Sequence, residues 1–345
     1  MAATIKDIAK KLNISVSTVS YALNDGPRSV PDDVKKRVLQ VAQEMQYRPN
    51  RVARNLVTRK SYTIGIVPSE ASSDIVLSPY LQNSLNGIVN TAEVRHYDVL
   101  FFTRYDQQQT REMANVLLDG RADGLIFLAP PTHAPVLDLV AEYGIPHVVV
   151  AGESRASSPH FGVDNSGGVR LALEHLRSLG HRKIGHLHGR LHMEDGLVRQ
   201  VAFKEFLAVQ GLSERQEWMA PGDFTIEGGY EGMKQILASA ERPTAVFCAN
   251  DEIAVGAIRA AHESGLTVPD DLSIVGFDNV SLAANFLPAV TTIRQPVQEL
   301  ASEATSALID LIENEEPVSS KILSTELIVR DSTSRPKEDP SHDPH

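Results

Sequence analysis

The hydrophobic pattern of residues 4–24 predicts two short helices separated by a tight turn. The apolar face of the first helix has helical spacing and consists of Ile5, Ile8, Ala9 and Leu12. The apolar face of the second helix consists of Val19, Ala22 and Leu23. Thr4 and Ser15 are suited to cap the two helices, and Asn13 tolerates the left-handed backbone of a sharp turn. The pattern is typical of a helix-turn-helix, whose second helix enters the DNA major groove.

A third helix and a shorter helical pattern follow. The helix predicted over residues 31–47 has an apolar stripe that consists of Val34, Val38, Val41, Ala42 and Met45. Residues 50–57 also have helical spacing, but eight residues are too few for a stable isolated helix in water. Leu56 beside Arg51 and Arg54 suits a segment that orders on DNA and wedges a minor-groove base step. An ordinary polar linker is the alternative.

From Ser61 onward, continuous hydrophobic runs alternate with helical patterns. The predicted strands cover residues 62–68, 99–102, 124–128, 147–150, 183–187, 244–248 and 272–276. The predicted helices cover residues 80–96, 109–119, 134–143, 166–179, 196–210, 226–239 and 252–264. A helix over 297–314 and a strand over 322–329 complete the pattern. Buried strands separated by helices predict parallel sheets covered on both faces, here two doubly wound units forming a bilobed body with a cleft.

The charge distribution separates the head from the body. Residues 1–60 hold 12 Lys and Arg against 5 Asp and Glu, whereas the remainder holds 21 basic and 39 acidic residues. The total of −11 therefore conceals a basic head of +7 and an acidic body of −18. A polyanion such as DNA is expected to meet only the head.

Exposed positions of the second helix are the candidates for contacting DNA. Val16 suits a thymine methyl group, and Ser17 and Tyr21 suit hydrogen bonds to base edges, with Ser20 beside them. Hydroxyl and amide groups that suit phosphate oxygens come from Thr4, Ser15, Thr18 and Asn24.

Polar and aromatic residues follow several predicted strands of the body, at the edge where parallel sheets bind ligands. They are Tyr80, Asp164, Asn165, Arg199, Phe224, Asn250, Asp251, Asp278 and Asn279. Carboxylates accept hydrogen bonds from hydroxyl pairs, so the set suits a polyhydroxylated ligand. The alternative for each residue is a helix cap or a turn.

Other chemistries receive little support from the sequence. His181, His186, His188 and His192 lie close together, but no cysteine or paired carboxylate completes a metal shell, so we expect no metal and no cofactor. No GxGxxG, GxxxxGK[ST] or GxSxG motif occurs, so nothing indicates a dinucleotide, P-loop or hydrolase site. The single Cys248, the absence of an apolar run of about 18 residues and the polar N-terminus predict a cytoplasmic protein without a membrane partner.

The head closely resembles the lactose-repressor/galactose-repressor (LacI/GalR) family. The motifs that carry the resemblance are residues 4–9, 17–20, 23–24, 47–50 and 52–56. The resemblance implies that residues 50–57 form a hinge helix, which pairs across a homodimer and inserts Leu56 into the operator. Its implied DNA contacts are Asn50, Arg51, Ala53, Arg54 and Leu56, and it places Val16, Ser17 and Tyr21 at operator-reading positions. Tyr21 departs from the arginine or histidine often found at its position.

The body resembles the same family and the periplasmic sugar-binding proteins that share its fold. The matching blocks are residues 120–126, 163–165, 180–185, 243–247, 250–251, 275–279 and 288–296. The resemblance implies effector contacts from Tyr80, Asp164, Arg199, Phe224, Asn250 and Asp278. The stretch 190–195, which contributes ligand specificity in the family, matches no effector type.

These observations predict a domain order and a function. The expected order is a helix-turn-helix domain over 1–49, a hinge over 50–60, a body over 61–334 and a disordered tail over 335–345. Within the body, the N-lobe covers about 61–163 and 294–321, and the C-lobe about 164–293 and 322–334. We expect a homodimeric repressor, not an enzyme, released from a palindromic double-stranded DNA operator by a sugar in the interlobe cleft. The alternatives are a family member that answers to a nucleobase or a partner protein, and a sugar-binding protein without a DNA role.

Overall fold

The computed structural model describes residues 3–24, 29–47, 60–68, 78–103, 110–314 and 317–337. The chain divides into two compact units, residues 1–61 and 62–345. The hinge predicted over 50–57 lies outside the described residues. The boundary predicted at residue 49 therefore stays a prediction.

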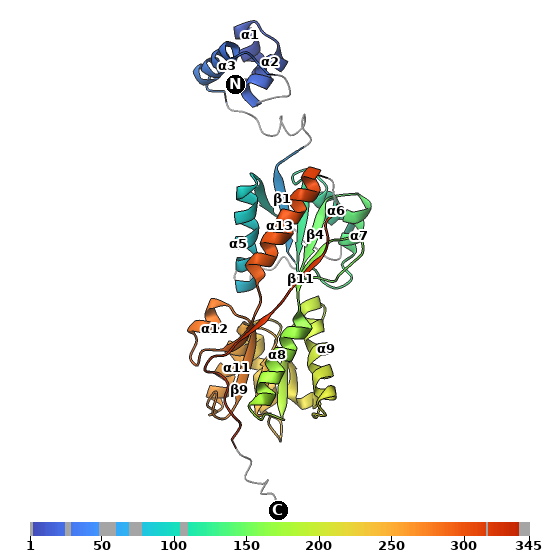
Figure 1. The fold of residues 1–345 in the computed structure, drawn as a ribbon, viewed down its shortest axis with the longest axis vertical. Coiled ribbons are helices and arrows are strands. Elements are labelled where there is room, and N and C mark those ends of the chain that lie inside the picture. Colours follow the sequence, from blue (N-terminus) through green and yellow to red (C-terminus); the bar gives the residue numbers. More distant parts are fainter. Residues whose placement is uncertain are drawn as a thin grey trace, which may run out of the picture. The chain divides into compact units, whose positions relative to one another are not determined.

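Three helices form the head (Figure 1): α1 (Ile5–Leu12), α2 (Val16–Asn24) and α3 (Asp32–Glu44). A capping box begins α1, because the Thr4 N–H donates to Asp7 Oδ2 at 2.9 Å and the Asp7 N–H to Thr4 Oγ1 at 3.4 Å. Asn13 ends α1 in the left-handed conformation with a φ of 53°. The buried core consists of Ile8, Ala9, Val19, Ala22, Val38, Val41 and Ala42. The predicted helix-turn-helix and third helix are thus confirmed.

The first lobe is built on a six-stranded parallel sheet with the order β11-β5-β4-β3-β1-β2. The strands are β1 (Thr63–Pro68), β2 (Asp98–Phe101), β3 (Gly124–Leu128), β4 (His147–Val150), β5 (His160–Val163) and β11 (Lys321–Leu323). One face packs against α5 (Pro79–Val94) and α13 (Val297–Asn314), and the other against α6 (Thr110–Leu117) and α7 (Pro135–Glu142). Two separate hydrophobic clusters therefore sandwich this sheet.

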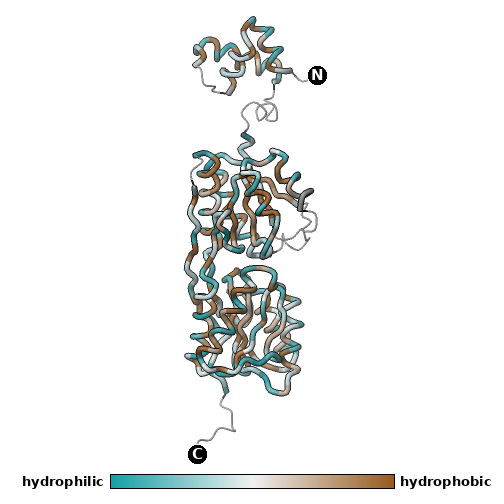
Figure 2. The backbone as a smooth tube through the Cα atoms, turned by 90° about the vertical axis from the view of Figure 1, so that its right-hand side faces the viewer, coloured by the Kyte–Doolittle hydropathy of each residue, from teal (hydrophilic) through white to brown (hydrophobic). Residues whose placement is uncertain are grey.

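The second lobe repeats this plan with the order β12-β10-β9-β8-β6-β7. Its strands are β6 (Ile184–His188), β7 (Met219–Pro221), β8 (Ala245–Cys248), β9 (Ser273–Asp278), β10 (Thr291–Arg294) and β12 (Glu326–Ile328). One face is covered by α8 (Asn165–Ser178) and α9 (Glu194–Val209), the other by α10 (Ile226–Leu237) and α11 (Asp251–Glu263). A short helix, α12 (Ser281–Asn285), and a 3-10 turn at Gln216–Trp218 complete the lobe. Figure 2 shows hydrophobic segments concentrated along the interior of both lobes.

Three chain segments join the two lobes: residues 163–165, 294–297 and 323–326. The single strand predicted over 322–329 is wrong, because β11 pairs with β5 in the first lobe and β12 pairs antiparallel with β10 in the second. The crossing therefore lies after Leu323, two residues later than predicted. Apolar residues continue across the crossing, so the hydrophobic pattern carries no sign of it.

Two further features differ from the prediction. The short strands β5, β7 and β10 were not predicted, since three or four residues give little periodic signal. The tail predicted as disordered from Arg335 begins with three described residues, 335–337, and the Lys337 ammonium donates to Asp271 Oδ1 at 2.5 Å. Among the described helices, none combines the length and hydropathy that crossing a bilayer requires.

Candidate functional site

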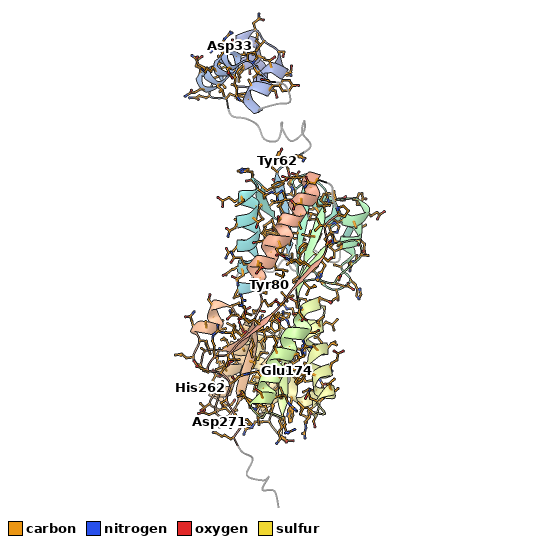
Figure 3. The ribbon with its side chains drawn as sticks, viewed as in Figure 1. Asp33, Tyr62, Tyr80, Glu174, His262 and Asp271 are labelled. Carbon is orange, nitrogen blue, oxygen red and sulfur yellow. The ribbon has the colours of Figure 1, made fainter. Side chains whose placement is uncertain are left out.

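A cavity of about 480 Å³ lies between the two lobes. It forms where the carboxyl ends of the strands of both sheets meet, the edge at which open α/β sheets bind ligands. Its lining includes Pro68 at the end of β1, Leu128 at the end of β3 and Asp278 at the end of β9. Figure 3 places Tyr80, also in the lining, at the level where the two lobes meet.

The two lobes contribute different chemistry to this cavity. The nonpolar contributions of the first lobe are Pro68, Leu81, Leu128, Ala129 and Ala151. The charged and amide groups of the second lobe are Arg190, Asp195, Arg199, Glu227, Asn250, Glu252 and Asp278. The second lobe also contributes Met193, Phe224 and Ile226, and the first lobe Ser78 and Tyr80. The charged groups of the described lining therefore all come from the second lobe, whereas apolar groups come from both.

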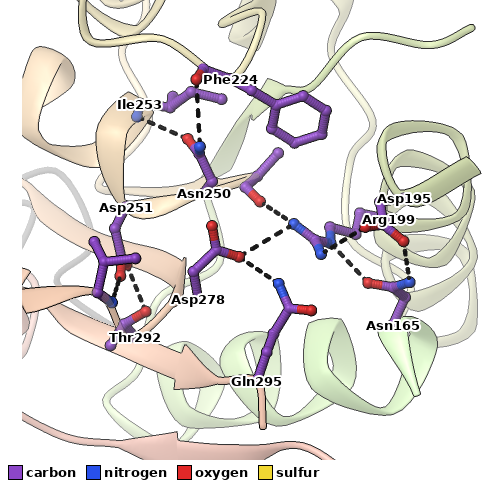
Figure 4. A network of polar contacts seen from close by, with 12 residues as sticks. Asn165, Asp195, Arg199, Phe224, Asn250, Asp251, Ile253, Asp278, Thr292 and Gln295 are labelled. Atoms are coloured by element: carbon purple, nitrogen blue, oxygen red, sulfur yellow. Dashed lines mark hydrogen bonds and ion pairs between the residues drawn. The ribbon is translucent and has the colours of Figure 1, made fainter. Parts of the chain in front are cut away.

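Arg199 is the centre of a buried polar network (Figure 4). Its Nε donates to Asn165 Oδ1 at 2.8 Å and its Nη1 to the Ala249 carbonyl at 2.6 Å. Its guanidinium also lies 3.6 Å from an Asp195 oxygen and 3.7 Å from an Asp278 oxygen. The side chain is 2% exposed and stacks 3.9 Å above the centre of the Phe277 ring. Arg199 thus holds residues from α8, α9, β8 and β9 in a fixed arrangement.

Asp278 ends β9 and faces the same network. The Gln295 side-chain amide donates to its Oδ1. Burial raises the pKa of Asp278 to about 7, and the nearby positive charge of Arg199 opposes that rise. The backbone φ values of 114° at Asp278 and 60° at Asn279 lie in a region that L-residues rarely adopt. Strained backbone of this kind is found where a side chain must be presented at a defined site.

Asn250 combines a structural role with a place in the lining. Its Oδ1 accepts from the Ile253 N–H at 2.9 Å and so caps α11. Its Nδ2 donates to the Phe224 carbonyl at 3.4 Å. Phe224 has a φ of 58°, and its ring lies directly over Gly189, where an added Cβ would approach the ring to 2.1 Å. The cap and the glycine therefore fix the Phe224 ring beside the cavity.

The Tyr80 hydroxyl is buried and makes no hydrogen bond to the residues that the structure describes. Burial raises its pKa above the ordinary value, and the charges of Asp195 and Asp278 add to that rise. A buried hydroxyl without a partner costs stability unless a bound molecule satisfies it.

The structure places Asp164, one of the predicted ligand contacts, at the N-terminus of α8. Asp164 is exposed, is absent from the described lining and caps α8, because its Oδ1 accepts from the Gly167 N–H at 2.7 Å. The neighbouring Asn165 is buried instead and links Arg199 to Asp195, to which its Nδ2 donates at 2.8 Å. Asp164 is therefore observed as a helix cap, which was the alternative role that the sequence left open.

The structure brings together Tyr80, Arg199, Phe224, Asn250 and Asp278 as predicted neighbours, and it adds residues that were not predicted. The additions with polar or polarisable groups are Ser78, Arg190, Met193, Asp195, Thr225, Glu227, Glu252 and Gln295. Burial raises the pKa of Glu252 to about 7, and the charge of Asp278 adds to the rise. Only their position in the sequence could have identified these residues, because each lies within a few residues of the carboxyl end of a strand or of a helix N-terminus.

A second contact between the lobes lies beside the cavity. The Thr132 N–H and the Thr132 hydroxyl both donate to the His192 carbonyl, at 2.9 and 3.2 Å. Pro131 and Met193 form an isolated antiparallel bridge at the same place. Met193 also lines the cavity and directly precedes α9, which carries Arg199. The contact therefore adjoins the N-terminus of the helix that carries Arg199.

The histidines that suggested a metal site have structural partners. His186 stacks between Phe203 and Phe247, with ring centres 4.7 and 5.1 Å away, and burial lowers its pKa to about 3. His181 lies 2.9 Å from Thr244 Oγ1 and 3.0 Å from Ser273 Oγ. Among residues 3–24, 29–47, 60–68, 78–103, 110–314 and 317–337, no group of three His, Cys, Asp or Glu is placed to hold a metal ion.

In the head, the second helix presents the predicted surface. Val16 is 40% exposed, and Ser15 and Ser17 are exposed beside it. Ser15 Oγ accepts from the Thr18 N–H at 3.0 Å, so Ser15 caps α2 as the sequence predicted. Tyr21 is half-buried. The side chain of Asn24 and the candidates Asn50, Arg51, Ala53, Arg54 and Leu56 lie outside the described residues.

Comparison with known sequences gives matches along most of the chain. Residues 4–50 match the family "Bacterial regulatory proteins, lacI family", and residues 173–333 match "Periplasmic binding protein-like domain". The HTH-type transcriptional repressor PurR of Erwinia tasmaniensis is 35% identical over 314 residues, 90% of each chain. The repressor PurR of Klebsiella pneumoniae is 35% identical over 324 residues, 93% of each chain.

Solved structures give the same picture. A Lac repressor dimer bound to operator and the anti-inducer ONPF has a TM-score of 0.85 and 27% identity, covering 97% of this chain and 100% of that one. A complex of the transcriptional regulator CelR with cellobiose has a TM-score of 0.74 and 26% identity, covering 96% and 99%.

Proposed function

This chain belongs to the lacI family of bacterial regulatory proteins, and on that premise we propose that a small ligand in the interlobe cavity controls its binding to an operator. It is a DNA-binding transcriptional repressor, not an enzyme. What is proposed beyond the family is the site of control and the class of ligand.

The buried network around Arg199 carries the proposal. It joins α8, α9, β8 and β9 at the floor of a cavity that both lobes line. A ligand that donates hydrogen bonds to Asp278 or Asp195 changes the balance of charge around Arg199. Because the lobes are joined by three short crossings, such a change is transmitted as a change in the angle between them.

For the ligand, a nucleobase is the first candidate. The relatives called PurR support it better than the sugar that the sequence suggested. The apolar wall of the first lobe and the Phe224 ring suit the faces of a planar heterocycle, while the carboxylates of the second lobe accept from its N–H groups.

A sugar is the second candidate, and one observation favours it. The CelR structure, which covers 96% of this chain, is a complex with cellobiose. A carboxylate-rich wall opposite an apolar wall also suits a sugar ring, whose hydroxyls lie on its edge and whose C–H groups lie on its face. Both candidate ligands would form hydrogen bonds to the carboxylates of the second lobe. They differ in that a nucleobase also needs a flat surface, such as the Phe224 ring, against its planar face.

On the DNA side, we propose that α2 reads the operator through Val16, Ser17 and Tyr21, with Ser20 beside them. Thr4, Ser15, Thr18 and Asn24 are assigned to phosphate contacts. We further propose that the protein binds a palindromic operator as a homodimer and inserts Leu56 at the operator's centre. The other predicted DNA contacts of the same segment are Asn50, Arg51, Ala53 and Arg54. The operator-bound Lac repressor dimer supports this homodimeric arrangement through its likeness in fold.

The test is an operator-binding titration of the purified full chain. Each of a set of nucleobases and sugars is added to the complex of the protein with DNA from its own promoter region, and the apparent Kd is measured by fluorescence anisotropy. We expect at least one compound to change the Kd about tenfold or more, as a typical allosteric coupling does. A compound that binds the body without changing DNA affinity, even at saturation, contradicts the proposal.

A further inference from the structure

The charges around the cavity define the class of ligand more narrowly. Four carboxylates and two guanidinium groups belong to the described lining: Asp195, Glu227, Glu252, Asp278, Arg190 and Arg199. We infer that the effector carries no phosphate or other anionic group and presents several hydrogen-bond donors to the second lobe. The inference rests on the proposed function, because it concerns the ligand of the same cavity.

Arg199 offers little charge to an anionic ligand. Its Nε and Nη1 already donate to Asn165 and to the Ala249 carbonyl. The oxygens of Asp195 and Asp278 lie within 3.7 Å and compensate its charge. A phosphate that approached this guanidinium would have to displace the carboxylates of Asp195 and Asp278. Otherwise its negative charge would lie beside theirs with no positive charge to balance it.

The helix N-termini around the cavity are also occupied by acids. A helix N-terminus is a common anion site, because free N–H groups and the helix dipole favour negative charge there. Here the first turn of α9 carries Glu194 and Asp195, and that of α10 carries Glu227. The first turn of α11 carries Asp251 and Glu252. Acidic residues of the chain itself therefore hold the positions that a phosphate would need.

Two of these acids have acceptor capacity left for a ligand. Glu252 is half-buried, and its carboxylate accepts a long hydrogen bond of 3.4 Å from the Asn250 amide. Glu227 is exposed on the first turn of α10, at the edge of the same lining. Together with Asp278 they give the lining three carboxyl groups that can accept hydrogen bonds, which favours hydroxyl, N–H or ammonium donors.

An unpartnered group on the opposite wall indicates a ligand independently of the acids. The buried Tyr80 hydroxyl has no partner among the described residues, although it lines the cavity. The nonpolar Leu81 and Leu128 of the same lobe belong to this lining as well. A neutral ring that places its apolar face here and one polar atom at Tyr80 satisfies both features.

The test compares neutral compounds with their phosphorylated partners by thermal shift of the full chain. The pairs are adenine and AMP, ribose and ribose 5-phosphate, and glucose and glucose 6-phosphate, with inorganic phosphate added alone. We expect stabilisation only by unphosphorylated members, with a rise in Tm of about 3 °C or more at ten times Kd. Stabilisation of the wild type by a phosphorylated member or by phosphate, abolished by Asp278→Ala, overturns the inference.

A variant designed to gain phosphate binding tests whether the carboxylates of the lining are what excludes phosphate. In the double variant Glu227→Arg with Glu252→Gln, the lining acquires a positive excess. Its Tm should rise by about 3 °C in phosphate relative to chloride of equal ionic strength. The control with the same change in net charge is Glu174→Arg with Glu205→Gln, both on exposed helix surface outside the described lining. No gain in the cavity variant, or an equal gain in the control, contradicts the role of these acids.

The two proposals fail in different ways. If AMP or glucose 6-phosphate binds in the cavity and changes operator affinity, the proposed function stands and the charge inference is wrong. If only neutral compounds bind and none changes operator affinity, the charge inference stands and the proposed function is wrong.

Discussion

The two lobes have the same sheet order but meet the cavity with opposite chemistry. In both, a buried six-stranded sheet is sandwiched between helices, and the strands end at the cavity. The first lobe ends its strands with Pro68 and Leu128, whereas the second places Asp278 and the Asn250 cap there. The comparison shows that buried positions specify the shared fold, while the residues at the carboxyl ends of the strands set the chemistry that each lobe presents to the cavity.

The largest expected effect concerns the network that belongs to the second lobe alone. Arg199→Leu leaves the buried Asp278 and the half-buried Asp195 without their compensating charge, which should lower the free energy of unfolding by about 3–5 kcal/mol. The measurement is urea denaturation followed by circular dichroism. The matched control is Arg182→Leu, an exposed arginine of the same lobe, which should change stability by less than about 0.5 kcal/mol. Equal losses of stability in the two variants would mean that the buried network around Arg199 contributes no more than an exposed arginine.

The next effect separates ligand recognition from the fold. Asp278→Asn keeps the size of the side chain and its place beside Gln295 but removes the carboxylate that we assign to the ligand. Effector affinity should fall about 100-fold, close to 3 kcal/mol, as for loss of a charged hydrogen-bond acceptor. Operator binding without effector should stay within about twofold. Calorimetry and anisotropy measure the two quantities, and an equal loss of both would place Asp278 in the fold rather than in the ligand site.

The shared fold was predictable from the sequence to a large extent, and the cavity only in part. Long apolar runs such as Ile64–Val67 are visible without a structure, because burial on both faces leaves no polar alternation. Asp164 and Asn165 are adjacent polar residues after a strand, and nothing in the pattern tells which one points outward as a cap. Glu252 looks like an ordinary first-turn acid, and only the folded structure shows that it is half-buried in the cavity lining. The missing information is the contact between distant segments, which local periodicity does not contain.

A pH dependence should also distinguish the two walls. Burial raises the pKa of Asp278 and Glu252 to about 7, so both carry protons part of the time at neutral pH in the empty cavity. A donor ligand favours the ionised carboxylates, so affinity should rise between pH 6 and 8, by up to about tenfold for each group. Without ligand the sign is opposite. The folded state binds these protons more tightly than the unfolded chain, so the free energy of unfolding should fall as pH rises from about 4 to 7.

Calorimetric affinities at pH 6, 7 and 8 test this dependence. Glu252→Gln should remove part of the slope and Asp278→Asn another part. Tyr80→Phe, on the first lobe, should leave the slope unchanged. A slope that survives in the double variant Asp278→Asn with Glu252→Gln would assign the titration to other groups.

The smallest expected effect lies on the apolar wall. Tyr80→Phe removes a buried hydroxyl that has no partner among the described residues, so the empty protein should become more stable by about 1 kcal/mol. Effector affinity should fall about fivefold if the hydroxyl bonds to the ligand, since a neutral hydrogen bond contributes about 1 kcal/mol. The matched control is Tyr97→Phe, because the Tyr97 hydroxyl is also buried without a described partner in the same lobe but lies outside the described lining. Both variants should gain stability, whereas only Tyr80→Phe should lose affinity. If affinity is unchanged in both, the first lobe contributes shape alone, and hydrogen bonding belongs to the second lobe entirely.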